Sequence, residues 1–440
     1  MKSMTRNTLI LGLGLILGVM LAIGQGVLAE KESHSRLSSQ TIPLEDIRSL
    51  SEVFGKIKKH YVEDIEDKEL LENAIRGLLT GLDPHSAYLD KDAFTELREG
   101  TSGEFGGLGI VVGMKDGFVN VISPIDDTPA EKAGVKSGDL IIRLDDKNVK
   151  GMTLEDAVGI MRGKPDTDIE LTIVREGADK PLKIEITRAI IKIQSVRSKS
   201  LDKGFGYIRV SAFQERTGAD LRKAISKLKK ENGRQLKGLV LDLRNNPGGL
   251  LTQAIEVSDA FLEGGIVVSI KGRSESNTTT YSAKGLDLIN EAPIVVLING
   301  GSASASEIVA GALQDHKRAI IMGVQSFGKA SVQTVVPLGN GSALKLTTAR
   351  YYTPSGTSIQ AKGIIPDIVL DDVKVSKRED NGFKATKEKD LNGHLKGDGE
   401  KDNKKNSAKS DKVVLAKDDY ALYEALNLLK GLSVVKGLQK

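Results

Sequence analysis

Two short segments rich in small residues contain the side chains of this sequence best suited to chemistry. Residues 301–307, GSASASE, follow an apolar run at 293–300 and precede a helical pattern. This order predicts a strand, a tight turn and a helix, in which a hydroxyl lies at a helix N-terminus beside backbone N–H groups that can bind an oxyanion. The segment therefore predicts a nucleophilic serine, and the candidates are Ser302, Ser304 and Ser306.

A serine nucleophile needs a base, and the second segment offers one. None of the five histidines lies in a comparable motif; His85, in a turn beside Asp83, is interpreted as a local hydrogen-bonding residue. Residues 327–333, FGKASVQ, place Lys329 between glycine and alanine, with little nearby to solvate an ammonium. Burial of this kind favours the neutral amine, so Lys329 is a candidate base.

The elements that position these segments alternate between strand-like and helix-like patterns from residue 204 to residue 323. Such an order predicts a parallel or mixed sheet with helices on its faces. The strand-like runs 237–243 and 293–300 are each followed by a glycine-rich turn. Because ligands bind at the carboxyl ends of strands in these sheets, the two turns are expected to form one site.

A different pattern of short strand-like runs, with two short helical stretches, spans residues 104–188. The glycine-rich residues 106–110 open its first strand, where successive N–H groups can bind a carboxylate. The helical stretch 153–161 is expected to wall a groove beside them. The segment resembles a PDZ domain, which binds a C-terminal tail as an added strand, and the ordered phrases SP at 123–124, PA at 129–130 and GDLI at 138–141 strengthen the resemblance.

The N-terminus reads as a targeting segment. Lys2 and Arg6 precede the apolar run 9–23, and residues 27–29, VLA, offer a cleavage site. We interpret residues 1–29 as a signal peptide, with an uncleaved N-terminal anchor as the alternative. The absence of cysteine from the chain fits a periplasmic or otherwise exported protein, associated with the inner membrane if the anchor is retained.

Three further segments carry no predicted catalytic or binding residue. Amphipathic helical spacing predicts an N-terminal helical segment at 41–100, and a short C-terminal helix is predicted at 418–432. Residues 374–412 are dense in charge and nearly free of aromatics, which predicts a disordered linker.

Composition and motifs leave two alternatives to a hydrolase. The net charge of +4 over 440 residues, without a basic patch interleaved with aromatics, gives no indication of nucleic acid as a partner, and we expect none. Residues 323–329 fit the front of a nucleotide-binding P-loop, yet Ala330 replaces the hydroxyl that holds magnesium, and a strand-like pattern follows. The second alternative is a non-catalytic PDZ scaffold that binds protein C-termini.

From residue 44 to residue 367 the chain resembles the carboxyl-terminal processing peptidases, also called tail-specific proteases. The matching phrases are GLDPHS at 81–86, the PDZ domain, LDLRNNPGG at 241–249, GSASASE at 301–307, FGK at 327–329 and PSG at 354–356. The resemblance implies a multidomain α/β fold with an N-terminal helical segment, an inserted PDZ domain and a crotonase-like α/β protease core at 189–370.

The resemblance also implies the site. The family uses a Ser–Lys dyad assisted by a glutamine, and its spacing assigns these roles to Ser304, Lys329 and Gln333. The oxyanion would be bound by the N–H of Ala305 and by one from Gly248 or Gly249. Alanine at 330 departs from the glycine that usually follows the lysine, and no metal or cofactor is implied.

The implied partners are proteins with accessible C-termini. The N–H groups of Leu108, Gly109 and Ile110 would bind the carboxylate of an unstructured, apolar tail. Members of the family commonly form homo-oligomers through their terminal helices, and some rely on an adaptor protein.

Overall fold

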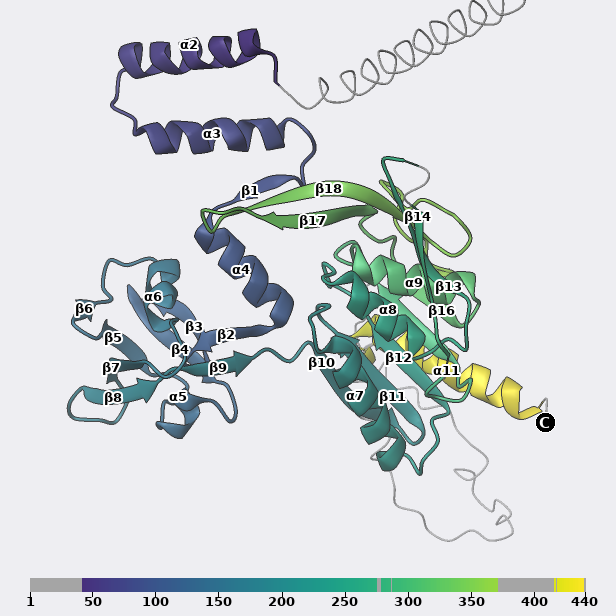
Figure 1. Cartoon of the computed structure of the whole chain (residues 1–440). Helices are drawn as coiled ribbons and strands as arrows, with labels where there is room; N and C mark the ends of the chain where they lie inside the picture. The colour runs from purple at the N-terminus through teal and green to yellow at the C-terminus, as the bar shows by residue number, and fades with distance from the viewer. Residues whose placement is uncertain (1–41, 275–277, 286, 371–414, 417, 439–440) are drawn as a thin grey trace, which may run out of the picture. The chain divides into compact units, whose positions relative to one another are not determined.

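The computed structural model describes residues 42–274, 278–285, 287–370, 415–416 and 418–438 (Figure 1). The predicted signal peptide or anchor at 1–29 and the predicted disordered linker at 374–412 lie outside the described residues. Contacts divide the chain into two units, Met1–Gly81 and Leu82–Lys440, which are described separately. Within the described ranges, no helix combines the length and the apolar character needed to cross a bilayer.

In the first unit the described residues form two helices, α2 (Leu44–His60) and α3 (Asp67–Thr80). Helix α2 has acidic residues in its first turn and basic residues in its last, an arrangement that complements the helix dipole. None of the residues of α2 is buried, so this helix contributes no core of its own.

The second unit begins with β1 (Ala87–Leu89) and α4 (Lys91–Ser102). The sequence predicted one helical segment over 41–100, but β1 pairs antiparallel with β18 (Ala343–Tyr352). The preceding turn is bonded to the same strand, because Thr347 donates to Asp83 Oδ1 at 3.1 Å and its N–H to Ser86 Oγ at 3.1 Å. Residues 82–102 therefore belong with the second unit.

The segment identified as PDZ-like is a small antiparallel sheet with the strand order β3-β4-β5-β7-β8, and β6 pairs with β5. Val119, Ile141 and Leu171 are fully buried in its core. Strands β2 and β9 pair antiparallel where the chain enters and leaves this domain. The elements are β2 (Glu104–Gly107), β3 (Ile110–Lys115), β4 (Phe118–Pro124), α5 (Pro129–Lys132), β5 (Leu140–Leu144), β6 (Lys147–Asn148), α6 (Leu154–Met161), β7 (Asp168–Val174), β8 (Leu182–Thr187) and β9 (Ala189–Lys192).

Outside the PDZ-like segment, one sheet has the order β10-β11-β12-β15-β16-β19. Its first pair is antiparallel and the other pairs are parallel, so the predicted mixed sheet is found. Strands β12 and β15 are buried along their whole length, as expected for parallel strands covered on both faces. The elements are β10 (Val196–Asp202), β11 (Phe205–Val210), α7 (Thr217–Glu231), β12 (Gly238–Asp242), α8 (Leu251–Asp259), β15 (Ile294–Ile298), α9 (Ala305–Asp315), β16 (Ala319–Gly323), β19 (Ile368–Val369) and α11 (Tyr420–Leu438).

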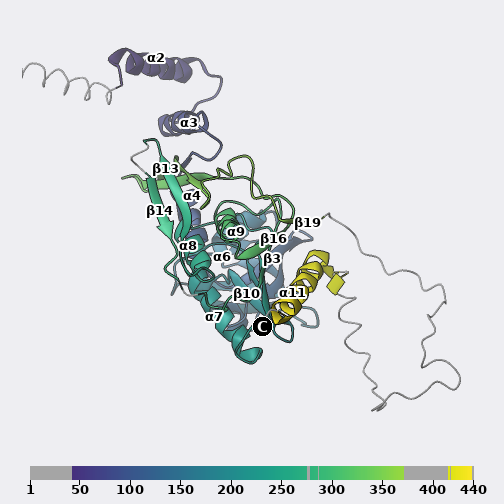
Figure 2. The same ribbon diagram turned by 90° about the vertical axis from the view of Figure 1, so that its right-hand side faces the viewer.

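Helices cover both faces of this sheet (Figure 1 and Figure 2). Side chains of α7, α8 and α9 pack with Leu239 and Leu241 on one face. Side chains of α11 pack with Val240 on the other, because successive strand residues point to opposite faces. The predicted C-terminal helix ended at 432, whereas α11 continues to Leu438.

A second sheet carries the strands around the candidate site. Its order is β1-β18-β13-β14, and β17 pairs with β18. The remaining strands are β13 (Ile266–Gly272), β14 (Thr278–Ser282) and β17 (Ser331–Pro337).

Candidate active site

The serine turn, residues 299–304, joins β15 to α9. Ser304 is the residue before the helix and has φ 55° and ψ −112°, a conformation that is uncommon outside glycine and concentrates at functional sites. Its N–H donates to Glu307 Oε2 at 2.7 Å, and its carbonyl accepts from Tyr351 Oη at 3.0 Å. The Ser304 hydroxyl therefore lies at the N-terminus of α9, as the sequence predicted.

A second turn, residues 244–249, carries the predicted oxyanion donors Gly248 and Gly249 and is called the oxyanion turn. It lies at the same edge of the sheet because β12 and β15 are parallel neighbours. The N–H of Ala303 donates to the carbonyl of Asn246 at 3.0 Å, and so does Ser306 Oγ at 2.9 Å. Ser302 Oγ donates to the Leu243 carbonyl at 2.8 Å. Ser302 and Ser306 are fully buried in these structural bonds, which separates them from Ser304 as candidate nucleophiles.

A single carboxylate joins the serine turn to the lysine loop, residues 324–330. Glu307 is fully buried and accepts from Ser304 N–H through one oxygen. The same side chain accepts from Lys329 N–H at 3.0 Å, Gly328 N–H at 2.7 Å and Ser326 Oγ at 2.6 Å. The loop that carries the predicted base is thus fixed relative to the turn that carries the predicted nucleophile.

The surroundings of Lys329 favour its neutral form. Burial lowers the pKa of Lys329, and the positive charge of Lys345 lowers it further, against the opposing carboxylates of Asp83 and Glu307. Burial also lowers the pKa of His85, with the Lys329 charge as the second cause. A lysine with a lowered pKa can serve as a general base nearer neutral pH.

A cavity of about 610 Å³ brings the predicted catalytic residues together. Ser304, Lys329 and Gln333 all line it, as do Ala305 and Gly249. The Gln333 amide donates to Ser331 Oγ at 2.8 Å and to Thr347 Oγ1 at 3.4 Å rather than to the lysine. Within the described residues, no hydrogen bond joins Ser304 Oγ to Lys329 Nζ. Apolar side chains from α4, α8 and β17 complete the wall, namely Phe94, Leu97, Leu251, Val332 and Val335.

Three backbone N–H groups, those of Ala305, Gly248 and Gly249, are candidates for the oxyanion hole. Ala305 is the first residue of α9, where the helix supplies no carbonyl for its N–H. The N–H of Gly248 donates to Asn246 Oδ1 at 2.9 Å, whereas Gly249 lines the cavity. Gly248 has φ 105°, and a Cβ there would lie 2.9 Å from the Cβ of Ser304. Gly248 is therefore needed for close approach of the two turns, and Gly249 is the better placed donor.

The predicted tail-binding residues lie in a separate groove. Leu108, Gly109 and Ile110 line a cavity of about 120 Å³ that is also lined by Val158 and Met161 of α6. This is the helix that the sequence expected to wall a groove. Gly109 has φ 80°, and a Cβ at this position would clash with Thr128, so the turn requires glycine.

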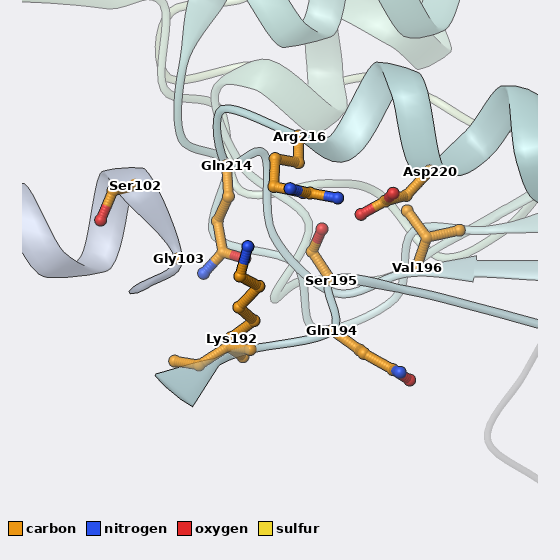
Figure 3. A pocket seen from close by; sticks show the side chains of 10 residues that line it. Ser102, Gly103, Lys192, Gln194, Ser195, Val196, Gln214, Arg216 and Asp220 are labelled. Carbon is orange, nitrogen blue, oxygen red and sulfur yellow. The ribbon is translucent and has the colours of Figure 1, made fainter. Parts of the chain in front are cut away.

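A further cavity, of about 280 Å³, lies beside the connection from β9 to β10 (Figure 3). Lys192, Ser195 and Gln214 line it, with Arg216 and Asp220 from the start of α7. Ile193 and Gly103 also line this cavity, and the Ile193 N–H donates to the Gly103 carbonyl at 2.8 Å. None of the predicted catalytic residues lines this cavity.

The sequence reasoning assigned no role to three residues of the site, Glu307, Tyr351 and Lys345. Glu307 carried a usable signal, since serine followed three residues later by glutamate is the capping-box pattern of a helix start. Tyr351 and Lys345 lie on β18 and gave no local signal. Within the described ranges, no three His, Asp or Glu side chains gather as a metal site would require.

Comparison with known proteins defines the class of the molecule. Residues 204–370 match peptidase family S41, residues 106–186 match the PDZ domain, and residues 9–93 match the N-terminal domain of the activating protease CtpB. The fold is therefore a mixed α/β protease core with a PDZ domain, as predicted. Strand β17 follows Lys329 where a P-loop would continue into a helix, so the nucleotide-binding alternative is wrong.

Two similar proteins place the chain more closely. It is 52% identical over 383 residues to the carboxy-terminal-processing protease of Bartonella bacilliformis, covering 86% of this chain and 87% of that one. It is 37% identical over 321 residues to the carboxy-terminal processing protease CtpA of Bacillus subtilis, covering 72% and 68%. The solved photosystem II D1 C-terminal processing protease is 33% identical, with a TM-score of 0.44 over 75% of this chain and 94% of that one.

This chain belongs to the carboxy-terminal-processing proteases of peptidase family S41. It is accordingly a serine-type peptidase, and the interpretation as a non-catalytic PDZ scaffold is set aside.

Proposed function

We propose that this peptidase cleaves exported proteins that it recognises by unstructured, apolar C-terminal tails, and that it does so with a Ser304–Lys329 dyad. Ser304 Oγ bonds to the scissile carbonyl carbon while its proton passes to Lys329 Nζ. The C–N bond then breaks, and the lysine delivers the proton to the leaving amine. A water molecule then attacks the acyl-enzyme and gives a proton to Lys329 Nζ. The bond between the acyl carbon and Ser304 Oγ breaks, and the lysine returns the proton to the serine oxygen, which restores the free enzyme.

The observation that carries this proposal is the shared cavity of Ser304 and Lys329, in which burial and Lys345 lower the pKa of the lysine. The negative oxygen of the tetrahedral intermediate would accept from the N–H groups of Ala305 and Gly249. Preorganised donors of this kind are usually the largest single contribution to such reactions.

Turnover of an unstructured protein with an apolar tail tests the dyad. Lys329→Met is expected to lower kcat at least about 100-fold, the usual minimum for a lost acid–base group. Ser304→Ala, which removes the nucleophile, is expected to lower kcat at least as much. Lys362→Met removes an exposed lysine from the same domain and is the control. Turnover that survives either of the first two substitutions would refute the dyad.

Recognition of the tail is proposed to occur in the groove beside Leu108, Gly109 and Ile110. Its lining is largely apolar, and its backbone N–H groups suit a terminal carboxylate. We expect a peptide with a free apolar C-terminus to bind more tightly than its C-terminal amide. Val158→Asp should abolish the difference, because its negative charge repels the terminal carboxylate, and Glu155→Gln at an exposed position of α6 should preserve it, as measured by calorimetry.

Export is proposed from the sequence of residues 1–29. The expected result is a mature protein that begins after Ala29 and is recovered outside the cytoplasm. N-terminal sequencing of the mature protein decides between cleavage and an anchor, and recovery of intact protein from the cytoplasm would refute export.

Self-association is proposed through α2. Leu44, Leu50 and Val53 are 61%, 62% and 53% exposed on this helix, which buries none of its own residues. A second copy of the helix would cover these side chains. Sedimentation should show an oligomer that Leu50→Asp dissociates and that Glu52→Gln, on the same helix, leaves intact; a monomeric wild type would contradict the proposal.

A further inference from the structure

A cluster of charges lies at the carboxyl end of β12 and takes no part in the proposed reaction. Asp242 is fully buried there, and its two oxygens accept from Arg244 Nε at 3.0 Å and Nη2 at 2.6 Å. Tyr207 Oη also donates to Asp242, at 2.8 Å. The other edge of the same guanidinium donates to Asp419, from Nη1 at 2.9 Å and Nη2 at 2.7 Å. Arg244 thus holds two carboxylates, each through two hydrogen bonds.

The second carboxylate comes from the far end of the chain. Asp419 lies directly before α11, and its Oδ1 accepts from Leu422 N–H at 3.0 Å, which caps the helix. Leu422, Leu426 and Leu429 of α11 are buried against the sheet. The pKa of Asp419 is lowered by its hydrogen bonds to Arg244, although its burial opposes this. The helix is therefore docked by an apolar face and by one charge-assisted pair.

Arg244 is also the first residue of the oxyanion turn. The next residue, Asn245, has φ 54°, and its N–H donates to Asn299 Oδ1 at 2.8 Å in the serine turn. Asn246 then accepts from the N–H groups of Gly248 and Ala303. Arg244 is therefore connected to Gly249 through a short segment whose residues Asn245 and Asn246 are hydrogen-bonded to the serine turn.

We propose that Asp419 is a positioning residue: by docking α11 on Arg244 it fixes the oxyanion turn, so that turnover depends on the C-terminal helix. This inference rests on the proposed function, in which Gly249 donates to the oxyanion. Without the Asp419 carboxylate, one edge of the guanidinium loses its two acceptors. Arg244 is then held by Asp242 alone, and the turn that follows it gains freedom to move.

The experiment uses the full-length protein and separates kcat from KM. Asp419→Asn should lower kcat at least about 10-fold, because misplacing an oxyanion donor costs up to 10²–10³. KM for a tailed substrate should stay within about twofold, since the tail-binding groove is untouched. Asp419→Glu should restore part of the loss, and the exposed neighbour Asp418→Asn should have no effect.

A second pair of variants keeps the test decisive if Asp419→Asn folds poorly. Arg244→Lys cannot bind both carboxylates through paired hydrogen bonds. In a double-mutant cycle, adding Asp419→Asn to Arg244→Lys should cost little more, because both changes break the same contact. Additive losses in kcat would overturn the proposal, as would a normal kcat in Asp419→Asn or a rise in KM alone.

Failure of this inference can be told apart from failure of the proposed function. If Ser304→Ala retains activity, the dyad is wrong whatever Asp419 does. If activity requires Ser304 but is insensitive to Asp419, only the positioning role is wrong.

Discussion

The buried carboxylate of Glu307 is the contact that joins the serine turn to the lysine loop, and its replacement by glutamine is a sharp test of the site. One oxygen accepts from the N–H groups of Ser304 and Lys329, and the other from Gly328 N–H and Ser326 Oγ. Glutamine has one acceptor oxygen and an NH₂ group in place of the other. Glutamine can therefore accept either from the N–H groups of Ser304 and Lys329 or from Gly328 N–H and Ser326 Oγ, but not from both pairs of donors.

The loss of local stability can be worked out from the N–H and O–H donors that lose their acceptor. With its oxygen towards Ser304 and Lys329, the new side chain turns its NH₂ towards the N–H of Gly328. That buried N–H loses its acceptor, which costs about 1–3 kcal/mol, and the remaining bonds lose the strength that the negative charge gave them. We expect Glu307→Gln to weaken the lysine loop locally by about 3 kcal/mol.

Hydrogen exchange of the peptide that covers residues 326–330 measures this directly. Because every 1.4 kcal/mol is a factor of ten, exchange by local opening should become roughly 100-fold faster. The kcat should fall in parallel, since the predicted base is no longer fixed. Glu263→Gln, at an exposed position, is the control. Exchange and kcat both within threefold of wild type would show that Glu307 does not hold the loop.

Three further predictions concern charge, shape and stability. Lys345→Met removes a positive charge that lowers the pKa of Lys329, so that pKa should rise. The midpoint of the rise of kcat/KM with pH should then move to higher pH. An unchanged or lower midpoint would refute the role of the neutral lysine. Gly248→Ala should lower kcat more than about 100-fold while tail binding by calorimetry stays normal, because its Cβ would lie 2.9 Å from the Ala303 carbonyl and displace an oxyanion donor. Arg175→Met leaves the buried Asp139 without its guanidinium partner and should destabilise the PDZ domain by about 3–5 kcal/mol, measured by thermal unfolding. Lys183→Met breaks the exposed ion pair with Glu170 and should cost less than about 1 kcal/mol.

Local patterns in the sequence were enough to predict the mixed sheet and the position of both glycine-rich turns. Strand β15 is a continuous apolar run followed by small residues, and β12 is a short apolar run that ends in Asp242 shortly before the turn NNPGG; both features are visible without any knowledge of distant contacts. The parallel pairing of these two strands brings the turns together, which the order of elements had indicated.

Contacts between distant parts of the chain could not be predicted in this way. Residues 83–89 read as a turn after a helix, because their partner β18 lies in a different part of the sequence. The same holds for Glu307 and the lysine loop, and for Asp419 and Arg244. The end of α11 was also missed: Gly431 weakens the helical pattern, yet the helix continues, and Lys436 near its end donates to the Glu291 carbonyl at 2.9 Å.

The pairing of β2 with β9 has a consequence for the modularity of the molecule. Glu104 faces Lys192 and Gly107 faces Ala189, so the PDZ domain starts and finishes side by side. The domain is an insertion into a core whose first strand, β1, precedes it and whose other strands follow it. Because adjacent antiparallel strands can be closed by a two-residue hairpin, the domain can be excised or exchanged at this ribbon while β1 stays joined to the strand it completes.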